Sequence, residues 1–422
     1  MMRGLILLFL FTLLISAFTA RWVILPYPAH AQNNRGFVTV SGKDFLLNGK
    51  IFKVKGCNLS TPNYNWAIDL YQTVPNENVE KQLLEAKKFN INVIRLEASY
   101  IGLGKDQVTE EKRDLLRYYL NLVGESDLKI IVSFFPDQPY FAEIKDPASR
   151  ELHKKHLSGI IPYFKDDPRI FAWEVANELL NPVADSKEDQ LIMIAWAKEM
   201  VNTIRTLDNN HLVTVGGAAD WTYTLHPEFS EFIDFVPVHY YPGYFYPGIP
   251  ERLPDYLDSQ IKAIRQSYPQ PILIEEVGIP TWTSGPELTT EELYQTQSKF
   301  YERICQEVEK NQDITGMIQW SIQDGNFNPV IEHPPDDYHY QWGLIKSDFS
   351  WKPAASVFRD CDIGQCHLRS KADTNCDNRI DSEDFSLLVE DYLREPVHNT
   401  DFNSDGRVDS EDFAILQANY LK

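Results

Sequence analysis

Two glutamates occupy positions from which a pair of carboxyl groups could act on a single bond. Glu178 and Glu276 each lie at the end of a short apolar run that is typical of a buried strand. Glycoside hydrolysis needs one carboxyl group to protonate the leaving oxygen and a second to attack or stabilise the sugar carbon, and a separation of about 5–5.5 Å implies retention. Glu275 competes with Glu276, but neighbouring side chains on a strand point to opposite faces. Only one of these two glutamates should therefore face that bond.

Eight short apolar runs alternate with amphipathic segments, as expected for a parallel sheet that is buried on both faces. The predicted strands are 52–57, 92–97, 129–134, 170–176, 212–216, 235–239, 272–276 and 316–322. The predicted helices are 79–89, 110–123, 151–164, 190–207, 256–267 and 291–310, and only the connection between the fifth and sixth strands lacks a clear helix. This pattern predicts an α/β fold, a (β/α)8 TIM barrel over 36–359 that opens with a β-hairpin. A doubly wound sheet is the alternative, but it would usually carry a glycine-rich phosphate turn after the first strand, and we find none.

A barrel of this order would place both glutamates at the carboxyl ends of strands four and seven, where barrel enzymes carry their catalytic groups. The motif Trp-x-x-x-Asn-Glu, which ends in Asn177 and Glu178, and the motif Glu-Val-Gly from Glu276 resemble clan A glycoside hydrolases, especially family five of cellulases and mannanases. The resemblance implies that Glu178 is the acid/base, Glu276 the nucleophile, and Asn177 a ligand of the sugar 2-hydroxyl. The third strand lacks the histidine that many cellulases of this family carry, which favours mannanases.

Four further residues match the family in the expected order. By resemblance, Arg95 and Tyr241 would hold the nucleophile in place and charged, His239 would lie beside the acid/base, and Trp320 would form a platform under the bound sugar. From the residues alone, Arg95 could instead serve a structural ion pair and His239 could be a core histidine. Weaker aromatic candidates for the cleft are Trp66, Tyr100, Trp221, Tyr244, Tyr246, Trp282 and Trp342.

The substrate stays open between β-1,4-mannan, which we favour, and β-1,4-glucan, and the sequence does not separate endo from exo action. A non-catalytic carbohydrate-binding or cell-surface protein is the alternative outside enzymes, and the intact pair of Glu178 and Glu276 argues against it. No cofactor is expected for catalysis. The formal charge of −21 excludes nucleic acid as a partner, because nucleic acid binding needs a basic surface. We expect a monomer that acts on a neutral polysaccharide.

The C-terminal segment 372–422 carries two copies of an acidic loop with a period of 28 residues. The oxygen spacing matches an EF-hand loop, so we predict two calcium ions. The predicted ligands are Asp373, Asn375, Asp377, Arg379, Asp381 and Asp384 in the first copy and Asp401, Asn403, Asp405, Arg407, Asp409 and Asp412 in the second, with each arginine offering its carbonyl. Asn378 replaces the glycine found at Gly406, so the first loop should bind calcium more weakly.

These repeats resemble dockerin type I repeats, whose loops also end in Asp. The resemblance implies a small all-α calcium-binding domain that docks on a cohesin-type scaffold domain. Both loops carry Ser-Glu at the family's recognition positions (Ser382-Glu383 and Ser410-Glu411), so the identity of the partner stays open. Residues 360–371 are polar and are predicted to be a linker.

The N-terminal residues 1–31 match an export signal, with Arg3 before an apolar run and small residues at Ala29 and Ala31. An uncleaved membrane anchor is the alternative, and either reading makes the protein secreted or attached to the cell surface. Export would permit disulfides. Of the five cysteines, Cys361 and Cys366 are close enough in sequence to bridge, and the odd number leaves at least one thiol free unless chains cross-link.

Overall fold

The structure is a computed structural model. It describes residues 36–59, 77–124, 128–135, 141–179, 186–217, 226–242, 253–282, 289–325, 341–361, 363, 372, 380–392, 400, 402–403 and 407–420. The predicted signal peptide lies outside these ranges. Among the helices that are described, none has both the length and the apolar character that crossing a membrane requires.

Eight parallel strands form the barrel sheet, and all eight correspond to predicted strands with ends shifted by a few residues at most. They are β4 (Val54–Asn58), β5 (Val93–Glu97), β6 (Lys129–Phe135), β7 (Ile170–Ala176), β8 (Leu212–Thr214), β9 (Val236–Tyr240), β10 (Ile272–Val277) and β11 (Ile314–Gln319). Their order is β8-β7-β6-β5-β4-β11-β10-β9. Two hydrogen bonds join β8 to the chain at the start of β9 and so close the barrel. The amide of Asp234 donates to the carbonyl of Val213 (2.9 Å), and the hydroxyl of Thr214 donates to the carbonyl of Phe235 (2.8 Å). The predicted (β/α)8 fold is confirmed.

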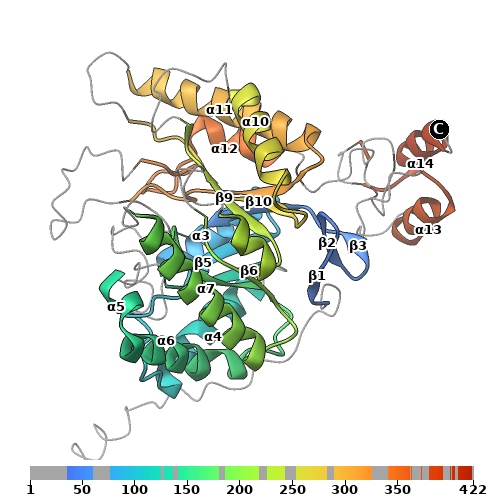
Figure 1. Ribbon diagram of the computed structural model, residues 1–422. Helices are drawn as coiled ribbons and strands as arrows, with labels where there is room; N and C mark the ends of the chain where they lie inside the picture. The colour runs from blue at the N-terminus through green and yellow to red at the C-terminus, as the bar shows by residue number, and fades with distance from the viewer. Residues whose placement is uncertain are drawn as a thin grey trace, which may run out of the picture. The chain divides into compact units, whose positions relative to one another are not determined.

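Amphipathic helices surround the sheet (Figure 1). They are α3 (Glu77–Lys87), α4 (Glu110–Gly124), α5 (Phe141–Lys145), α6 (Pro147–Ile160), α7 (Lys187–Leu207), α10 (Leu253–Arg265), α11 (Thr290–Lys310) and α12 (Pro353–Asp360). Local chemistry fixes several helix starts: Ser186 caps α7, and Thr289 forms a capping box with Glu292 at α11. The connection from β8 to β9 has only a 3-10 turn, η2 (Pro227–Glu231), in its described part, as the sequence predicted.

A small antiparallel sheet closes the N-terminal end of the barrel, opposite the strand ends that carry the catalytic candidates. The predicted hairpin is present as β1 (Val38–Ser41) and β2 (Asp44–Leu47), and β3 (Lys50–Ile51) extends it through a turn with positive φ at Asn48 and Gly49. Phe45 is fully buried and packs edge-on against Phe171 (4.9 Å) and Phe235 (5.3 Å). This small sheet keeps the N-terminal end of the barrel interior packed and apolar.

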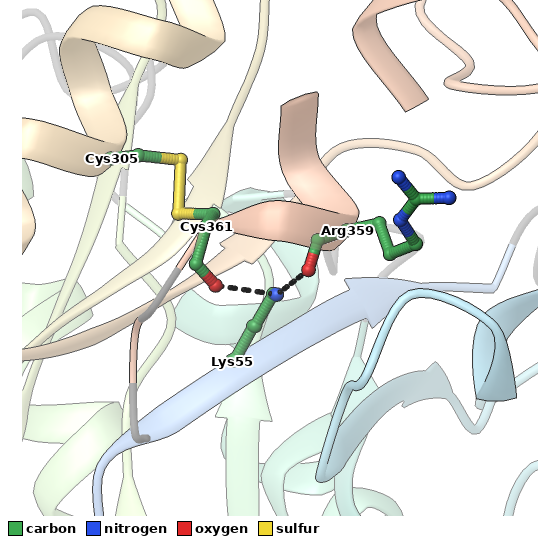
Figure 2. The surroundings of a disulfide bond; sticks show 4 residues. All are labelled: Lys55, Cys305, Arg359 and Cys361. Carbon is green, nitrogen blue, oxygen red and sulfur yellow. Dashed lines mark hydrogen bonds between the residues drawn. A yellow bond between two sulfur atoms is a disulfide. The ribbon is translucent and has the colours of Figure 1, made fainter. Parts of the chain in front are cut away.

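The disulfide is the main correction to the sequence predictions. Cys361 bonds to Cys305 of α11, with 5.7 Å between their Cα atoms, and not to Cys366, which lies outside the described residues. The Nζ of Lys55 donates to the carbonyls of Arg359 (2.9 Å) and Cys361 (2.7 Å), so two interactions hold the same stretch of chain (Figure 2). Separation in sequence hid this pair, because Cys361 follows α12, and only the tertiary packing of α12 beside α11 brings it to Cys305.

The barrel therefore extends beyond the boundary at 359. Cys361 is 4% exposed, and Ile363 belongs to the main hydrophobic core. The predicted linker from 360 thus begins with residues that are packed against the barrel. Cys57, on β4, is buried and carries a free thiol, in agreement with the expectation that an odd number of cysteines leaves at least one thiol free unless chains cross-link.

Removing the disulfide should destabilise the barrel. We expect the double variant Cys305→Ala/Cys361→Ala to lose about 2–4 kcal/mol of unfolding free energy, because the bond closes a loop with a sequence separation of 56 residues and so restricts the unfolded chain. Urea titration followed by tryptophan fluorescence measures the difference. A reductant should destabilise the wild type more than the double variant, and equal stability of the two proteins would contradict the bond.

The C-terminal module has its own small core. Its helices, α13 (Ser382–Asp391) and α14 (Ser410–Asn419), follow the two acidic loops as predicted. The core consists of the buried apolar residues Ala372, Ile380, Leu388, Phe402, Val408 and Leu416. The two copies use the same contact, since Asp384 accepts from the amide of Asp381 and Asp412 accepts from the amide of Asp409, both at 2.9 Å.

Candidate active site

Strand β7 delivers the first catalytic candidate at its carboxyl end. Glu178 follows the strand by two residues and has φ = 42°, a backbone conformation that residues with side chains seldom adopt and that often marks functional positions. Its side chain is 16% exposed, whereas that of Glu276 is 4% exposed. The more accessible carboxyl group is therefore the one that the resemblance assigns to proton transfer with a leaving group and water.

One imidazole nitrogen lies between the two catalytic candidates. The Nδ1 of His239, at the end of β9, is 3.0 Å from Oε1 of Glu178 and 3.2 Å from Oε2 of Glu276. One polar atom from each of the three side chains can be chosen so that all lie within 4.8 Å of one another. The structure thus brings together the two glutamates and the histidine that sequence reasoning had placed on three different strands.

Arg95 of β5 uses its whole guanidinium group to organise the site. It donates to Oε1 of Glu276 (2.7 Å), to Oδ1 of Asn177 (2.8 Å) and to Oδ1 of Asn58 (3.0 Å). Since arginine can only donate, it fixes the Asn177 amide with its oxygen inward, which leaves the Nδ2 donor for another partner. Burial would lower the pKa of Arg95, but the charges of Glu174, Glu275 and Glu276 raise it well above its ordinary value.

Both oxygens of Glu276 are held by different donors. Arg95 donates to Oε1, and the hydroxyl of Tyr241 donates to Oε2. Burial raises the pKa of Glu276, and the charges of His239 and Arg95 oppose this rise. Burial and the charge of Glu276 raise the pKa of Tyr241 well above its ordinary value, so the phenol remains a donor across neutral pH. This arrangement fixes the orientation of the Glu276 carboxyl group and limits its rotation.

Glu174 is a member of the site that the sequence analysis missed. It is fully buried on β7 and accepts two hydrogen bonds from Arg95 (2.7 and 2.6 Å) and one from the hydroxyl of Ser133 (3.0 Å). Burial raises the pKa of Glu174 to about 7, against the opposing effect of Arg95. Strand alternation gave no signal for Glu174, because Glu178 lies beyond the end of β7 with positive φ and the period of two cannot be counted back from it.

Strand β10 corrects the expectation that only one of two adjacent glutamates faces the site. The pairing of β10 with β9 shifts register between Ile274 and Glu276, a bulge that changes the direction of the side chains. Glu275 is consequently buried inside, with Oε2 3.7 Å from Nε2 of His239 and Oε1 4.0 Å from Nε of Arg95. Alternation applies to regular strands and fails at this bulge.

The close approach of β10 and β11 explains the glycine of the Glu-Val-Gly motif. A Cβ atom on Gly278 would lie 2.5 Å from the carbonyl oxygen of Trp320, so only glycine fits. Trp320 follows β11 and is 7% exposed, and Trp342 packs edge-on against Tyr241 at 5.1 Å. Trp342 therefore lies beside the site.

The other aromatic residues proposed to line the substrate cleft differ in where the structure places them. Tyr100 is wrong as a cleft residue, because it packs in the core against His153 and His156. Trp282 is partly buried. Trp66, Trp221, Tyr244 and Tyr246 lie outside the described residues.

The predicted calcium ligands are only partly within the described residues, which include Asp381, Asp384, Asn403, Arg407, Asp409 and Asp412. Asp384 and Asp412 are fully buried. Oδ1 of Asp412 accepts hydrogen bonds from the backbone amides of Phe402 (2.6 Å) and Asn403 (3.3 Å). These bonds connect the beginning of the second acidic loop to Asp412, which is its last residue. An oxygen-rich donor set with buried carboxylates fits a hard cation such as calcium.

Comparison with known proteins agrees with this geometry. Residues 45–326 match the family described as cellulase (glycosyl hydrolase family 5), and residues 371–421 match the dockerin type I domain. A curated relative, mannan endo-1,4-beta-mannosidase 4 of Solanum lycopersicum, is 24% identical over an alignment covering 76% of this chain and 95% of the relative.

Two solved structures share the fold. A glycoside hydrolase family 5 mannosidase from Rhizomucor miehei has a TM-score of 0.58 at 18% identity, with 78% of this chain and 98% of that chain covered. A GH2 beta-galacturonidase from Eisenbergiella tayi has a TM-score of 0.59 at 17% identity, with 77% of this chain covered, and the chain spans only 53% of that enzyme. The family match covers more than half of the sequence, and the carboxylate site lies at the barrel's strand ends. The chain belongs to glycosyl hydrolase family 5, is a glycoside hydrolase, and carries a C-terminal dockerin type I domain.

Proposed function

We propose that the protein is a retaining, endo-acting β-glycosidase that hydrolyses β-1,4-mannan by double displacement. The observation that carries the proposal is the shared position of the Glu178 and Glu276 carboxyl groups, which His239 contacts at 3.0 and 3.2 Å. Oxygens within 4.8 Å of each other correspond to the short separation of retaining enzymes, whereas inverting enzymes need about 6.5–9.5 Å to admit a water.

In the first step Glu276 attacks the anomeric carbon while Glu178 gives its proton to the departing glycosidic oxygen. The glycosidic bond breaks as the ester to Glu276 forms. In the second step Glu178 takes a proton from water, the water oxygen attacks the same carbon, and Glu276 leaves as a carboxylate. Asn177, held by Arg95, keeps its Nδ2 group free to donate to the sugar 2-hydroxyl, and Trp320 forms the platform under the ring.

Mannan is favoured over glucan by two facts. Curated relatives that match the chain are named mannan endo-1,4-beta-mannosidases, with 20–28% identity among those compared. The third barrel strand, β6, lacks the histidine that many cellulases of this family carry there, and its Ser133 donates instead to Glu174. The matched family's description as cellulase supports β-1,4-glucan as the second candidate.

A substrate panel decides between these candidates. We expect the purified protein to release reducing ends from β-1,4-mannan at least about tenfold faster, in kcat/KM, than from carboxymethylcellulose, which corresponds to a transition-state difference of about 1.4 kcal/mol. An endo enzyme should also lower the viscosity of mannan early in the reaction. Faster cleavage of carboxymethylcellulose would reverse the substrate assignment, and slow loss of viscosity with steady release of small sugars would indicate exo action.

We also propose that the enzyme is an exported monomer that docks through residues 372–422 on a cohesin-type domain and binds two calcium ions. The dockerin match supports the docking role, and the signal-like N-terminus with the Cys305–Cys361 disulfide supports an oxidising compartment. Calcium would be held by the oxygen ligands of the two repeats and would order the loops that precede α13 and α14.

Calcium should stabilise the C-terminal module. At 100 times the dissociation constant, one site adds about 2.7 kcal/mol to the unfolding free energy, so calorimetry should show a transition that moves up with calcium and down with EDTA. The chain truncated after residue 370 serves as the control and should lack this response. A full-length chain that melts identically with calcium and EDTA would contradict calcium binding.

A further inference from the structure

Glu275 is a fully buried carboxylate that the double displacement does not use. Neither of its oxygens has a hydrogen-bond partner among the described residues. The nearest cationic groups are Nε2 of His239 at 3.7 Å and Nε of Arg95 at 4.0 Å. Because an uncompensated buried carboxylate costs several kcal/mol, its position inside the site needs an electrostatic partner.

His239 meets carboxyl groups on both sides of its ring. Nδ1 faces Glu178 and Glu276, and Nε2 faces Glu275. A neutral imidazole has one N–H, so one of its nitrogens would direct a lone pair at a carboxylate. Only the doubly protonated ring is attracted to all three groups.

We propose that Glu275 is a positioning residue that stabilises the doubly protonated form of His239, whose Nδ1–H is directed at both Glu178 and Glu276. The inference rests on the proposed roles of those two glutamates. Burial by itself would lower the pKa of His239, but Glu276, Glu178 and Glu275 together raise it to about 10.

This arrangement has a mechanistic consequence. During the first displacement the negative charge leaves Glu276, which becomes an ester, and appears on Glu178, which has lost its proton. The Nδ1–H of His239 lies within 3.2 Å of both carboxyl groups, so it can pair with whichever one is charged without moving the ring. Glu275 thus serves both halves of the reaction by maintaining one fixed cation.

The groups that set this balance come from four strands. The titratable and charged residues facing His239 and Glu275 in the described structure are Arg95 on β5, Glu174 and Glu178 on and after β7, Tyr241 after β9, and Glu276 on β10. Removing the charge of Glu275 should lower the proton affinity of every acid and base in this set, because a negative neighbour favours protonation.

The first test observes the wild type. In protein labelled with 15N-histidine, the His239 signals, identified by their loss in His239→Asn, should show both ring nitrogens protonated at pH 7. A neutral His239 ring would overturn the proposal. This measurement does not depend on whether a variant folds.

The second test uses Glu275→Gln, which keeps the shape of the side chain and removes its charge. We expect the pKa of His239 to fall by about one unit or more, and both limbs of the kcat/KM pH profile to move to lower pH. Unmoved limbs together with an unchanged His239 titration would leave Glu275 with a packing role only.

Asp324→Asn is the matched control. Asp324 is a carboxylate whose side chain is 15% exposed, and it pairs with Lys352 at 2.7 Å. It should lower stability without shifting His239 or the pH limbs. If Glu178→Ala and Glu276→Ala remained fully active, the proposed function would fail, whereas the His239 titration would still test Glu275 separately.

Discussion

Replacing Glu276 with alanine is expected to abolish hydrolysis, with kcat/KM lowered by about 10⁴-fold or more. The variant lacks the carboxylate proposed to form the covalent bond, and Arg95 and Tyr241 lose the acceptor that they orient. Initial rates on mannan, or on an aryl β-glycoside that avoids dependence on polymer binding, measure the loss. Glu291→Ala on the first turn of α11 is the matched surface control and should keep wild-type rates.

Rescue by azide separates the two glutamates. In Glu276→Ala, azide in the vacated space should attack the sugar directly and give the α-glycosyl azide, with inversion. In Glu178→Ala, the ester still forms from a substrate with a good leaving group, so azide in place of water should give the β-glycosyl azide, with net retention. Full activity of Glu276→Ala, or exchanged azide products, would overturn the assigned roles.

Replacing Arg95 with methionine should remove both stability and activity. The guanidinium group makes five hydrogen bonds, to Glu174 (two), Glu276, Asn177 and Asn58. Its loss leaves buried carboxylates without their main cation, so we expect a loss of about 3–5 kcal/mol in unfolding free energy. Thermal melting and kcat/KM on the folded fraction measure the two effects.

Two controls distinguish charge from geometry at this position. Arg95→Lys keeps the charge but cannot form the paired contacts with Glu174, so it should recover stability more than activity. Lys55→Met removes another buried cation, whose Nζ donates to the backbone carbonyls of Arg359 and Cys361 and not to the catalytic carboxyl groups. This variant should lower stability and leave kcat unchanged. If Arg95→Met kept wild-type kcat/KM, Arg95 would have only the structural role that the sequence left open.

The sequence by itself determined the barrel and located the candidate catalytic pair. Apolar period and strand length are local properties, so all eight strands could be located from composition and spacing. The rule that catalytic groups follow the carboxyl ends of barrel strands then selected Glu178 and Glu276. The 28-residue repeat predicted the C-terminal helices for the same reason, since each loop and helix is encoded in one short segment.

Only the tertiary structure decided which distant side chains meet. Arg95 and Glu174 are separated by 79 residues and form a bidentate pair, and Cys361 finds Cys305 rather than Cys366. No local pattern encodes such pairs, because they depend on which strands and helices become neighbours.

The bulge in β10 is the clearest case of this limit. Regular alternation allowed only one of Glu275 and Glu276 to face the site, and the Glu-x-Gly spacing favoured Glu276, whereas a shift of register brought both inside. Register depends on how β10 pairs with β9, and that pairing forms only when the sheet does. The sequence thus identified the two residues proposed to react with the sugar, and the folded barrel added the buried charges that surround them.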